Sequence, residues 1–298
     1  MSSAAENRAW ESYWRENQGR GCVPDAPGVA AVLNDNWSNF ARRLPQGCAV
    51  IDLGSGAGAV LDMLGAARPD LDLVGVDSVP SLPGTAATSR VRTGVAMEQL
   101  PFADASFGAA CSQFGFEYGE MERSAAELAR VLAPASPVRL VLHDRAGPVV
   151  RQSESRLDAL RWTVEQNDFF ASAERLAEAR SIARLATPPS FQQAISEARR
   201  NFPAEPVAAE VLSALHAILV GGEARPQGTA AQVRTLHQRA SNEIATLSAL
   251  MRAAQDRAGI GNVAKLLDAA GIKATEPVAL VEPQRGLAFA WLIDATRK

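Results

Sequence analysis

The stretch that decides the fold is AVIDLGSGAG, residues 49–58, an apolar run that ends in Asp52 and continues into three glycines at alternate positions. A short apolar run bounded by glycine is typical of a buried β-strand. Glycine costs conformational entropy, so three of them in five residues need a physical reason. Without side chains, backbone N–H groups and the positive end of a following helix can approach a ligand closely. The stretch therefore predicts a strand, a ligand-binding turn and a helix.

Strand and helix patterns alternate through the following ninety residues. Helical spacing occurs over residues 59–69 and 122–134, and further strand candidates are 72–77, 91–95, 106–114 and 137–144. Strands separated by helices in this way predict right-handed crossovers and a parallel sheet that is covered on both faces. The fold class is predicted as α/β, a Rossmann-like doubly wound sheet.

The last forty residues return to this pattern after a long helical block. Residues 262–272 predict a helix that Gly271 closes, and residues 274–297 predict a β-hairpin of antiparallel strands around the turn EPQRG. Between the fifth strand and this helix, residues 150–257 are rich in Ala, Arg, Glu, Gln and Leu.

The helical block is predicted to hold about four helices. Its breaks fall at Pro188-Pro189, Pro203, Gly221-Gly222 and Pro226. Three domains follow from these patterns: a helical N-terminal segment over 1–47, a discontinuous Rossmann-like domain over 48–149 and 258–298, and a helical insertion over 150–257.

Composition limits the classes of function. The chain has 298 residues and a formal net charge of -3, so a dense basic face for nucleic acid or an anionic membrane is not expected. We find no apolar run of membrane-spanning length and no apolar signal-peptide core, and we expect a cytoplasmic protein. Cys22, Cys48 and Cys111 form no CxxC pair, so neither a metal site nor a disulfide framework is predicted.

The glycine turn alone does not choose its ligand. Gly54-x-Gly56-x-x-Ala59 also fits the dinucleotide fingerprint, with Asp77 near the place of a ribose-binding acid. However, Asp52 precedes the glycines, and a buried carboxylate there would repel a pyrophosphate. A cationic amino-acid ligand, or a loop tied by backbone N–H groups, suits it better. A nicotinamide oxidoreductase is therefore the weaker alternative.

Four segments together resemble class I S-adenosylmethionine-dependent methyltransferases, in the group that includes ubiquinone- and sterol-type small-molecule methyltransferases. The segments are VIDLGSGAG (50–58), VGVD (74–77), EQLPFADASF (98–107) and ELARVLAPASPVRLVLHD (127–144). They cover roughly residues 48–144, and the terminal hairpin agrees with the same fold. The resemblance implies S-adenosyl-L-methionine as the cofactor and a small organic molecule as the methyl acceptor.

The resemblance also implies cofactor contacts along the first, second and fourth strands. The residues are Asp52, Gly54, Ser55, Gly56, Asp77, Ser78, Met97, Glu98, Ser112 and Gln113. In this interpretation Asp77 accepts both ribose hydroxyls, since a carboxylate offers paired acceptors. Met97 and Glu98 lie near the adenine, and Ser112 and Gln113 lie near the reactive methyl. Ala96 stands where many family members have the aspartate that binds the adenine amino group.

An N-terminal cover for the cofactor is a further hypothesis. Trp10, Tyr13 and Trp14 occur at helical spacing, which is also typical of residues that pack on a core. In this family such segments often fold over the cofactor, so Trp14 is expected against it and Arg15 or Arg20 against its carboxylate.

Candidate catalytic residues follow the fourth and fifth strands. His143 ends a strand and could serve as a general base, or could only hydrogen-bond a neighbouring loop. Glu117 and Tyr118 could orient a substrate, or could simply begin a helix.

The predicted function is methyl transfer to a small organic acceptor by in-line displacement. The insertion would act as a lid that shapes the acceptor pocket, or would form a homodimer through a stripe of residues over 233–251. A catalytically silent protein that binds S-adenosylmethionine as a scaffold or regulator remains the alternative from a different class.

Overall fold

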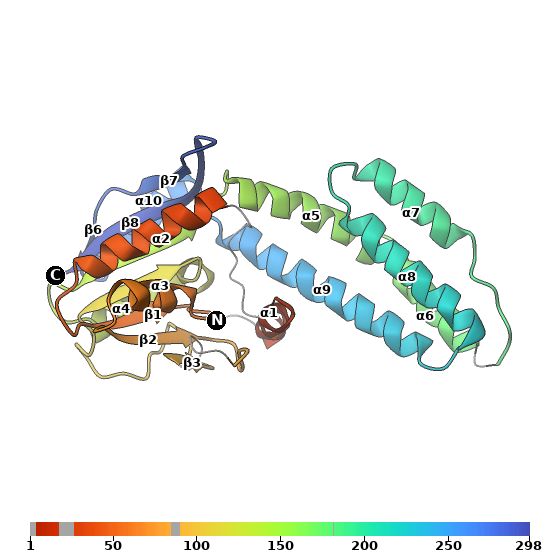
Figure 1. Cartoon of the computed structure of the whole chain (residues 1–298), viewed down its shortest axis with the longest axis horizontal. Coiled ribbons are helices and arrows are strands. Elements are labelled where there is room, and N and C mark those ends of the chain that lie inside the picture. Colours follow the sequence, from red (N-terminus) through yellow and green to blue (C-terminus); the bar gives the residue numbers. More distant parts are fainter. Residues whose placement is uncertain (1–3, 18–26, 85–89, 181) are drawn as a thin grey trace. The chain divides into compact units, whose positions relative to one another are not determined.

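The computed structural model describes residues 4–17, 27–84, 90–180 and 182–298, and the chain divides into two compact units (Figure 1). The first unit comprises residues 1–151 and 249–298, and the second comprises residues 152–248. The first unit holds a mixed β-sheet, and the second is helical.

The sheet has the strand order β3-β2-β1-β4-β5-β8-β6, with β7 paired to β8. Its strands are β1 (Ala49–Leu53), β2 (Asp72–Asp77), β3 (Val91–Thr93), β4 (Ala109–Gln113), β5 (Pro137–His143), β6 (Ile272–Ala274), β7 (Val278–Glu282) and β8 (Leu287–Arg297). The first five strands pair in parallel, and β8 runs antiparallel to β5. This arrangement confirms the predicted Rossmann-like fold with an antiparallel C-terminal edge.

Helices cover both faces of the sheet. On one face lie α2 (Pro27–Arg42) and α3 (Ala59–Ala67), which Figure 1 draws in front of the strands, with Trp37 completely buried among them. On the other face lie α4 (Met121–Val131) and α10 (Arg257–Ala269), with Leu128 and Leu267 completely buried. The interior strands read as continuous apolar runs because side chains on both faces leave water.

The strand order reverses between β1 and β4, which are neighbours in the middle of the sheet. From β1 the chain continues through β2 to β3 at one edge, and from β4 it continues through β5 toward the other edge. β1 pairs with β2 on one side and with β4 on the other. Open α/β sheets form a crevice at the carboxyl ends of the strands at such a reversal. The glycine turn after β1 opens directly onto this place.

The C-terminal hairpin differs from the prediction by one added strand. β7 and β8 form the expected antiparallel pair, while β6 also pairs with β8. With three residues, β6 is too short to show a period-2 pattern. α10 begins five residues before the predicted start, because Asp256 caps it by accepting a hydrogen bond from the Gly259 N–H at 2.7 Å.

The described part of the helical unit takes in five helices where about four were predicted. They are α5 (Pro148–Val164), α6 (Phe169–Ala179), α7 (Ser190–Asn201), α8 (Val207–Ala224) and α9 (Thr229–Ala253), of which α5 and α9 also reach into the first unit. The break between α5 and α6 falls in EQND, which lacks the proline and glycine that marked the other breaks. Gly221-Gly222 does not break α8, where Gly222 packs closely against Thr229.

One expectation about apolar runs is wrong. α8 is long and apolar enough to cross a membrane by length and composition alone, the single such helix among the described residues. Its Leu212, Leu215 and Leu219 are completely buried, and it packs against α6 and α7. A core helix of a folded domain meets the same two criteria.

Candidate functional site

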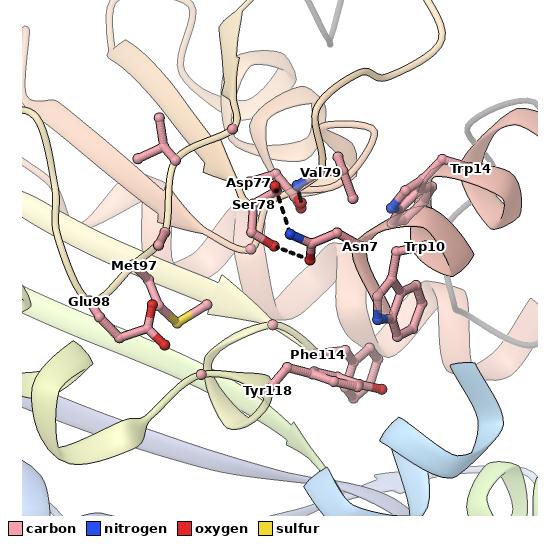
Figure 2. A pocket seen from close by; sticks show the side chains of 16 residues that line it. Asn7, Trp10, Trp14, Asp77, Ser78, Val79, Met97, Glu98, Phe114 and Tyr118 are labelled. Carbon is pink, nitrogen blue, oxygen red and sulfur yellow. Dashed lines mark hydrogen bonds between the residues drawn. The ribbon is translucent and has the colours of Figure 1, made fainter. Parts of the chain in front are cut away.

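A cavity of about 250 Å³ opens at the carboxyl ends of β1, β2 and β4 in the first unit (Figure 2). Five parts of the chain line it: the helix α1 (Ala4–Glu16), the glycine turn after β1, the end of β2 with the segment that follows it, the loop 94–98, and the segment that leads from β4 through the short 3-10 helix η2 (Phe116–Tyr118). Among the residues with predicted cofactor contacts, the structure brings Gly54, Asp77, Ser78, Met97, Glu98 and Trp14 to this cavity.

The glycines after β1 are required by the backbone and by close neighbours. Gly54 and Gly56 have φ angles of 63° and 50°, in the left-handed region that favours glycine. A Cβ on Gly54 would lie 2.8 Å from the Cα of Gly115, and a Cβ on Gly56 would lie 2.3 Å from the indole of Trp14. The turn can therefore carry no side chain at either position.

Asp77 lies at the end of β2 and holds the glycine turn. Its Oδ2 accepts a hydrogen bond from the Gly56 N–H at 2.8 Å, and its Oδ1 accepts one from the Val79 N–H at 3.0 Å. Burial raises the pKa of the Asp77 carboxyl, and these backbone hydrogen bonds oppose that rise. The two oxygens of a carboxylate are paired acceptors, which suits a ligand with two neighbouring hydroxyls.

Asp52 holds the turn from beneath and does not line the cavity. Its side chain is buried and accepts a hydrogen bond from the Ser55 hydroxyl at 2.6 Å. Burial raises the pKa of Asp52 to about 7, with the hydrogen bonds from Ser55 and Cys111 opposing it. Asp52 therefore contacts the glycine turn through Ser55, and it does not line the cavity where a ligand amino group would lie.

Met97 and Glu98 line the cavity on the side of the loop that precedes β4 (Figure 2). Glu98 is buried, and its Oε1 accepts a hydrogen bond from the backbone N–H of Glu120 at 2.9 Å. This contact fixes the Glu98 carboxylate at the cavity wall, beside the backbone of Ala96.

Ser112 and Gln113 do not line the cavity, although the family resemblance implied a position near the reactive methyl. The Ser112 hydroxyl donates to the Leu53 carbonyl at 2.6 Å and accepts from the Phe116 N–H at 3.0 Å. The Gln113 amide oxygen accepts from the Trp37 indole N–H at 2.7 Å. Both side chains therefore stabilise the sheet and the turn after β4.

The helix α1 provides one wall of the cavity. Figure 2 shows Trp10 and Trp14 projecting from it, with Trp14 over the glycine turn and Trp10 toward Tyr118. The Asn7 amide donates to the Ser78 carbonyl at 3.5 Å and accepts from the Ser78 hydroxyl at 3.4 Å, which ties α1 to the end of β2. The predicted contact of Arg20 lies outside the described residues.

The three candidate catalytic residues lie together. The Nδ1 atom of His143 is 2.8 Å from the Glu117 Oε1, which also accepts a hydrogen bond from the His143 backbone N–H at 3.0 Å. The imidazole stacks on Phe114 with ring centroids 4.2 Å apart and meets Tyr118 edge-on at 6.0 Å. Phe114 and Tyr118 line the cavity, so the buried His143–Glu117 pair lies directly behind its wall.

Several lining residues had no sequence assignment. Trp10 was noted in the sequence as part of the aromatic stripe of α1, but it was not assigned to the cofactor. Asn7 has no sequence pattern that indicates a site, because only the packing of α1 brings it to Ser78. Phe114 and Gly115 follow β4, where the φ of Phe114 is 56°. A non-glycine residue at positive φ is uncommon, but the sequence does not reveal it.

Within the described ranges of the chain, no group of three or more His, Cys, Asp and Glu residues could hold a metal ion. Cys48 and Cys111 are buried free thiols, as the apolar surroundings in the sequence indicate.

Residues 51–138 match the family model of a methyltransferase domain. No curated protein matches the chain. Among solved structures, 1,6-didemethyltoxoflavin-N1-methyltransferase from Burkholderia thailandensis, which contains 1,6-didemethyltoxoflavin and S-adenosylhomocysteine, is similar with a TM-score of 0.51 and 12% identity, over 100% of this chain and 92% of that chain.

Two further structures are similar over nearly the whole chain. A possible histamine N-methyltransferase from Thermotoga maritima has a TM-score of 0.47 and 12% identity, over 98% of this chain and 100% of that chain. A methyltransferase from Haloferax volcanii, solved in complex with an activator protein, has a TM-score of 0.47 and 11% identity, over 100% and 99%.

The domain match confirms the resemblance to methyltransferases for the part of the chain that forms the glycine turn, β2 and β4. The likeness to the Burkholderia enzyme shows the fold. The finer resemblance to the ubiquinone- and sterol-type group stays a prediction.

Proposed function

We propose that this protein is an S-adenosylmethionine-dependent methyltransferase that acts on a small organic acceptor. The observation that carries the proposal is the cavity beside Asp77 and the side-chain-free turn at Gly54, both inside the stretch that matches a methyltransferase domain. The cofactor is S-adenosyl-L-methionine, which that match supports; when bound, it supplies an electrophilic methyl group on a sulfonium.

The residues present fit this cofactor. The carboxylate of Asp77 lines the cavity, and its paired oxygens suit the two ribose hydroxyls. Met97 and Glu98 would contact the adenine, and Gly54 would lie against the ribose and methionine part. Trp10, Trp14 and Tyr118 would exclude water from the reacting atoms.

The chain's own contribution to the reaction is alignment and proton transfer. An in-line displacement needs the nucleophile held on the axis of the breaking bond, which the aromatic wall of Phe114 and Tyr118 could provide. Glu117 orients the imidazole of His143, which could remove a proton from an acceptor that must lose one.

Calorimetric titration of the full chain with S-adenosylmethionine, S-adenosylhomocysteine and NAD tests this proposal. We expect the two sulfur nucleosides to bind and NAD to give no heat of binding. Binding of NAD alone would overturn the proposal in favour of an oxidoreductase. An S-adenosylhomocysteine release assay with a panel of small acceptors then distinguishes an enzyme from a silent binding protein, which would bind the cofactor without turnover.

A further inference from the structure

A second, smaller cavity of about 90 Å³ adjoins the first within the same unit. Trp10 and Tyr118 line both cavities, with ring centroids 5.3 Å apart in an edge-to-face arrangement. The remaining wall includes Glu6 of α1, Glu117 of η2 and Arg252 of the last turn of α9. A group bound there would lie beside the cofactor cavity, because the same two aromatic side chains line both cavities.

Glu117 gives this small cavity an unused acceptor. Its side chain has no exposed surface, and its Oε1 is occupied by the backbone N–H and the Nδ1 of His143. Its Oε2 is buried and has no hydrogen-bond partner among the described residues. A buried carboxylate oxygen without a partner keeps the full cost of losing its contact with water, so such an atom points to a ligand.

The charges around the cavity favour a cationic ligand. Glu6 and Arg252 form an ion pair with each other, so their charges compensate. Among the described residues, Glu117 has His143 as its ion-pair partner and no Lys or Arg within ion-pair distance. The faces of Trp and Tyr rings attract a neighbouring cation, which adds to the attraction of the carboxylate.

We propose that the small cavity binds the acceptor and that the acceptor is an amine, which donates an N–H to the Glu117 Oε2. This inference rests on the proposed function. The bound ammonium first gives one proton to the Nε2 of His143, because only the neutral amine has the lone pair that attacks. The nitrogen then forms the new N–C bond while the bond from sulfur to the methyl carbon breaks, so the sulfonium becomes a neutral thioether and the product leaves as a methylated ammonium ion. Glu117 stabilises the imidazolium that results.

The binding experiment uses the full chain with benzylamine and its neutral isostere benzyl alcohol as probes, each titrated with and without S-adenosylhomocysteine. We expect benzylamine to bind about tenfold more tightly than benzyl alcohol, because a charge-assisted hydrogen bond to a carboxylate is the stronger one. Equal affinity for the two probes, or no binding of benzylamine, would overturn the inference.

Three variants test the assignment of the charges. Glu117→Gln should weaken benzylamine binding about tenfold, while Glu122→Gln, an exposed carboxylate on the neighbouring helix, should not change it. Arg252→Gln should strengthen binding about threefold, because the exposed guanidinium repels a cationic ligand. Because Arg252 is exposed, this variant retains its fold, and weaker or unchanged binding in it would contradict the inference.

The two proposals fail separately. If S-adenosylhomocysteine does not bind, the proposed function fails, whereas the benzylamine titration of the free protein still reports on the small cavity. If S-adenosylhomocysteine binds to the wild type and to Glu117→Gln equally, but benzylamine affinity is the same in both, only the amine inference fails. Mass spectrometry of the turned-over acceptor must then locate the methyl on nitrogen; a methyl on oxygen would also overturn it.

Discussion

Asp77 and Asp52 end neighbouring strands and hold the same turn, but their surroundings give them different tasks. Asp77 contacts the cavity and binds backbone N–H groups at 2.8 Å and 3.0 Å. Asp52 lies beneath the turn and binds the Ser55 hydroxyl. The role of Asp77 can therefore be tested by measuring ligand affinity, and the role of Asp52 by measuring stability.

Replacing Asp77 with Asn should weaken S-adenosylhomocysteine binding at least about tenfold, because the amide offers one acceptor oxygen where the carboxylate offers two. Calorimetric titration measures the change. The matched control is Asp72→Asn, at the exposed start of the same strand, for which we expect no change. Equal affinity of Asp77→Asn and the wild type would contradict the predicted ribose contact.

The pH dependence of stability should reveal Asp52. Its pKa is raised from 3.8 to about 7, so between these values the folded state retains a proton that the unfolded state has released. Stability from this group is fully present below pH 3.8 and is lost as the pH rises through 7, at no more than about 1.4 kcal/mol per pH unit. Asp52→Asn cannot ionise and should avoid this loss.

Urea unfolding of both proteins at pH 5 and pH 8 measures the effect. We expect the free energy of unfolding of Asp52→Asn, relative to that of the wild type, to be about 1–4 kcal/mol higher at pH 8 than at pH 5. Parallel pH profiles would show that Asp52 ionises in the folded protein as it does in water.

At the level of elements, the turn between β1 and α3 is shaped by two other parts of the chain. The turn after β4 approaches Gly54 with its backbone at Gly115, and α1 approaches Gly56 with the side chain of Trp14. A backbone cannot give way without moving a strand, whereas a side chain can be removed. Removing the Trp14 side chain should therefore relieve a substitution at Gly56 and not one at Gly54.

Gly54→Ala and Gly56→Ala should each lower the free energy of unfolding by about 1–3 kcal/mol, because both positions have positive φ and a close neighbour. Adding Trp14→Ala should restore part of the loss in Gly56→Ala and none in Gly54→Ala. Thermal unfolding of the single and double variants gives the coupling free energy. Equal coupling of Trp14→Ala to both glycines would refute this account.

For the whole molecule, the helical unit is inserted where β5 and α10 bring both of its ends to one place. Arg145 donates from its backbone to the Gln255 carbonyl at 3.0 Å, and Gln255 donates to the His143 carbonyl at 2.9 Å. Val150 and Leu250 pack together in the same region. The first unit thus contains every residue that lines either cavity.

Replacing residues 152–248 with a short Gly/Ser linker should leave S-adenosylhomocysteine affinity within about threefold of that of the full chain, because the excised unit contributes no lining residue. Calorimetry measures the affinity, and thermal unfolding verifies that the shortened chain is folded. A folded variant that no longer binds would contradict the assignment of the site to the first unit. Loss of turnover with retained binding would support the predicted lid.

The homodimer through the stripe over 233–251 also belongs to this scale and stays a prediction. Val233, Ala240 and Ile244 of that stripe are buried within the chain itself, which leaves Leu236, Leu247 and Met251 as its more exposed members. Light scattering coupled to size exclusion measures the mass, and a strictly monomeric protein would exclude the dimer.

The sequence by itself determined the strand, the turn and the acid at the end of β2, because each is a local pattern whose period or backbone requirement is written in adjacent residues. Residues 49–58 and Asp77 are found where that reasoning placed them. It also determined that His143, Glu117 and Tyr118 follow strands at the carboxyl edge of the sheet.

Tertiary structure decided which of these side chains meet. Gln113 turns to Trp37 of α2, Asn7 reaches Ser78 from α1, and Glu117 pairs with His143 across β4 and β5. Each pairing joins residues far apart in the chain, and its geometry depends on how helices and strands pack. Local patterns carry no record of packing, so only the fold could bring these groups together.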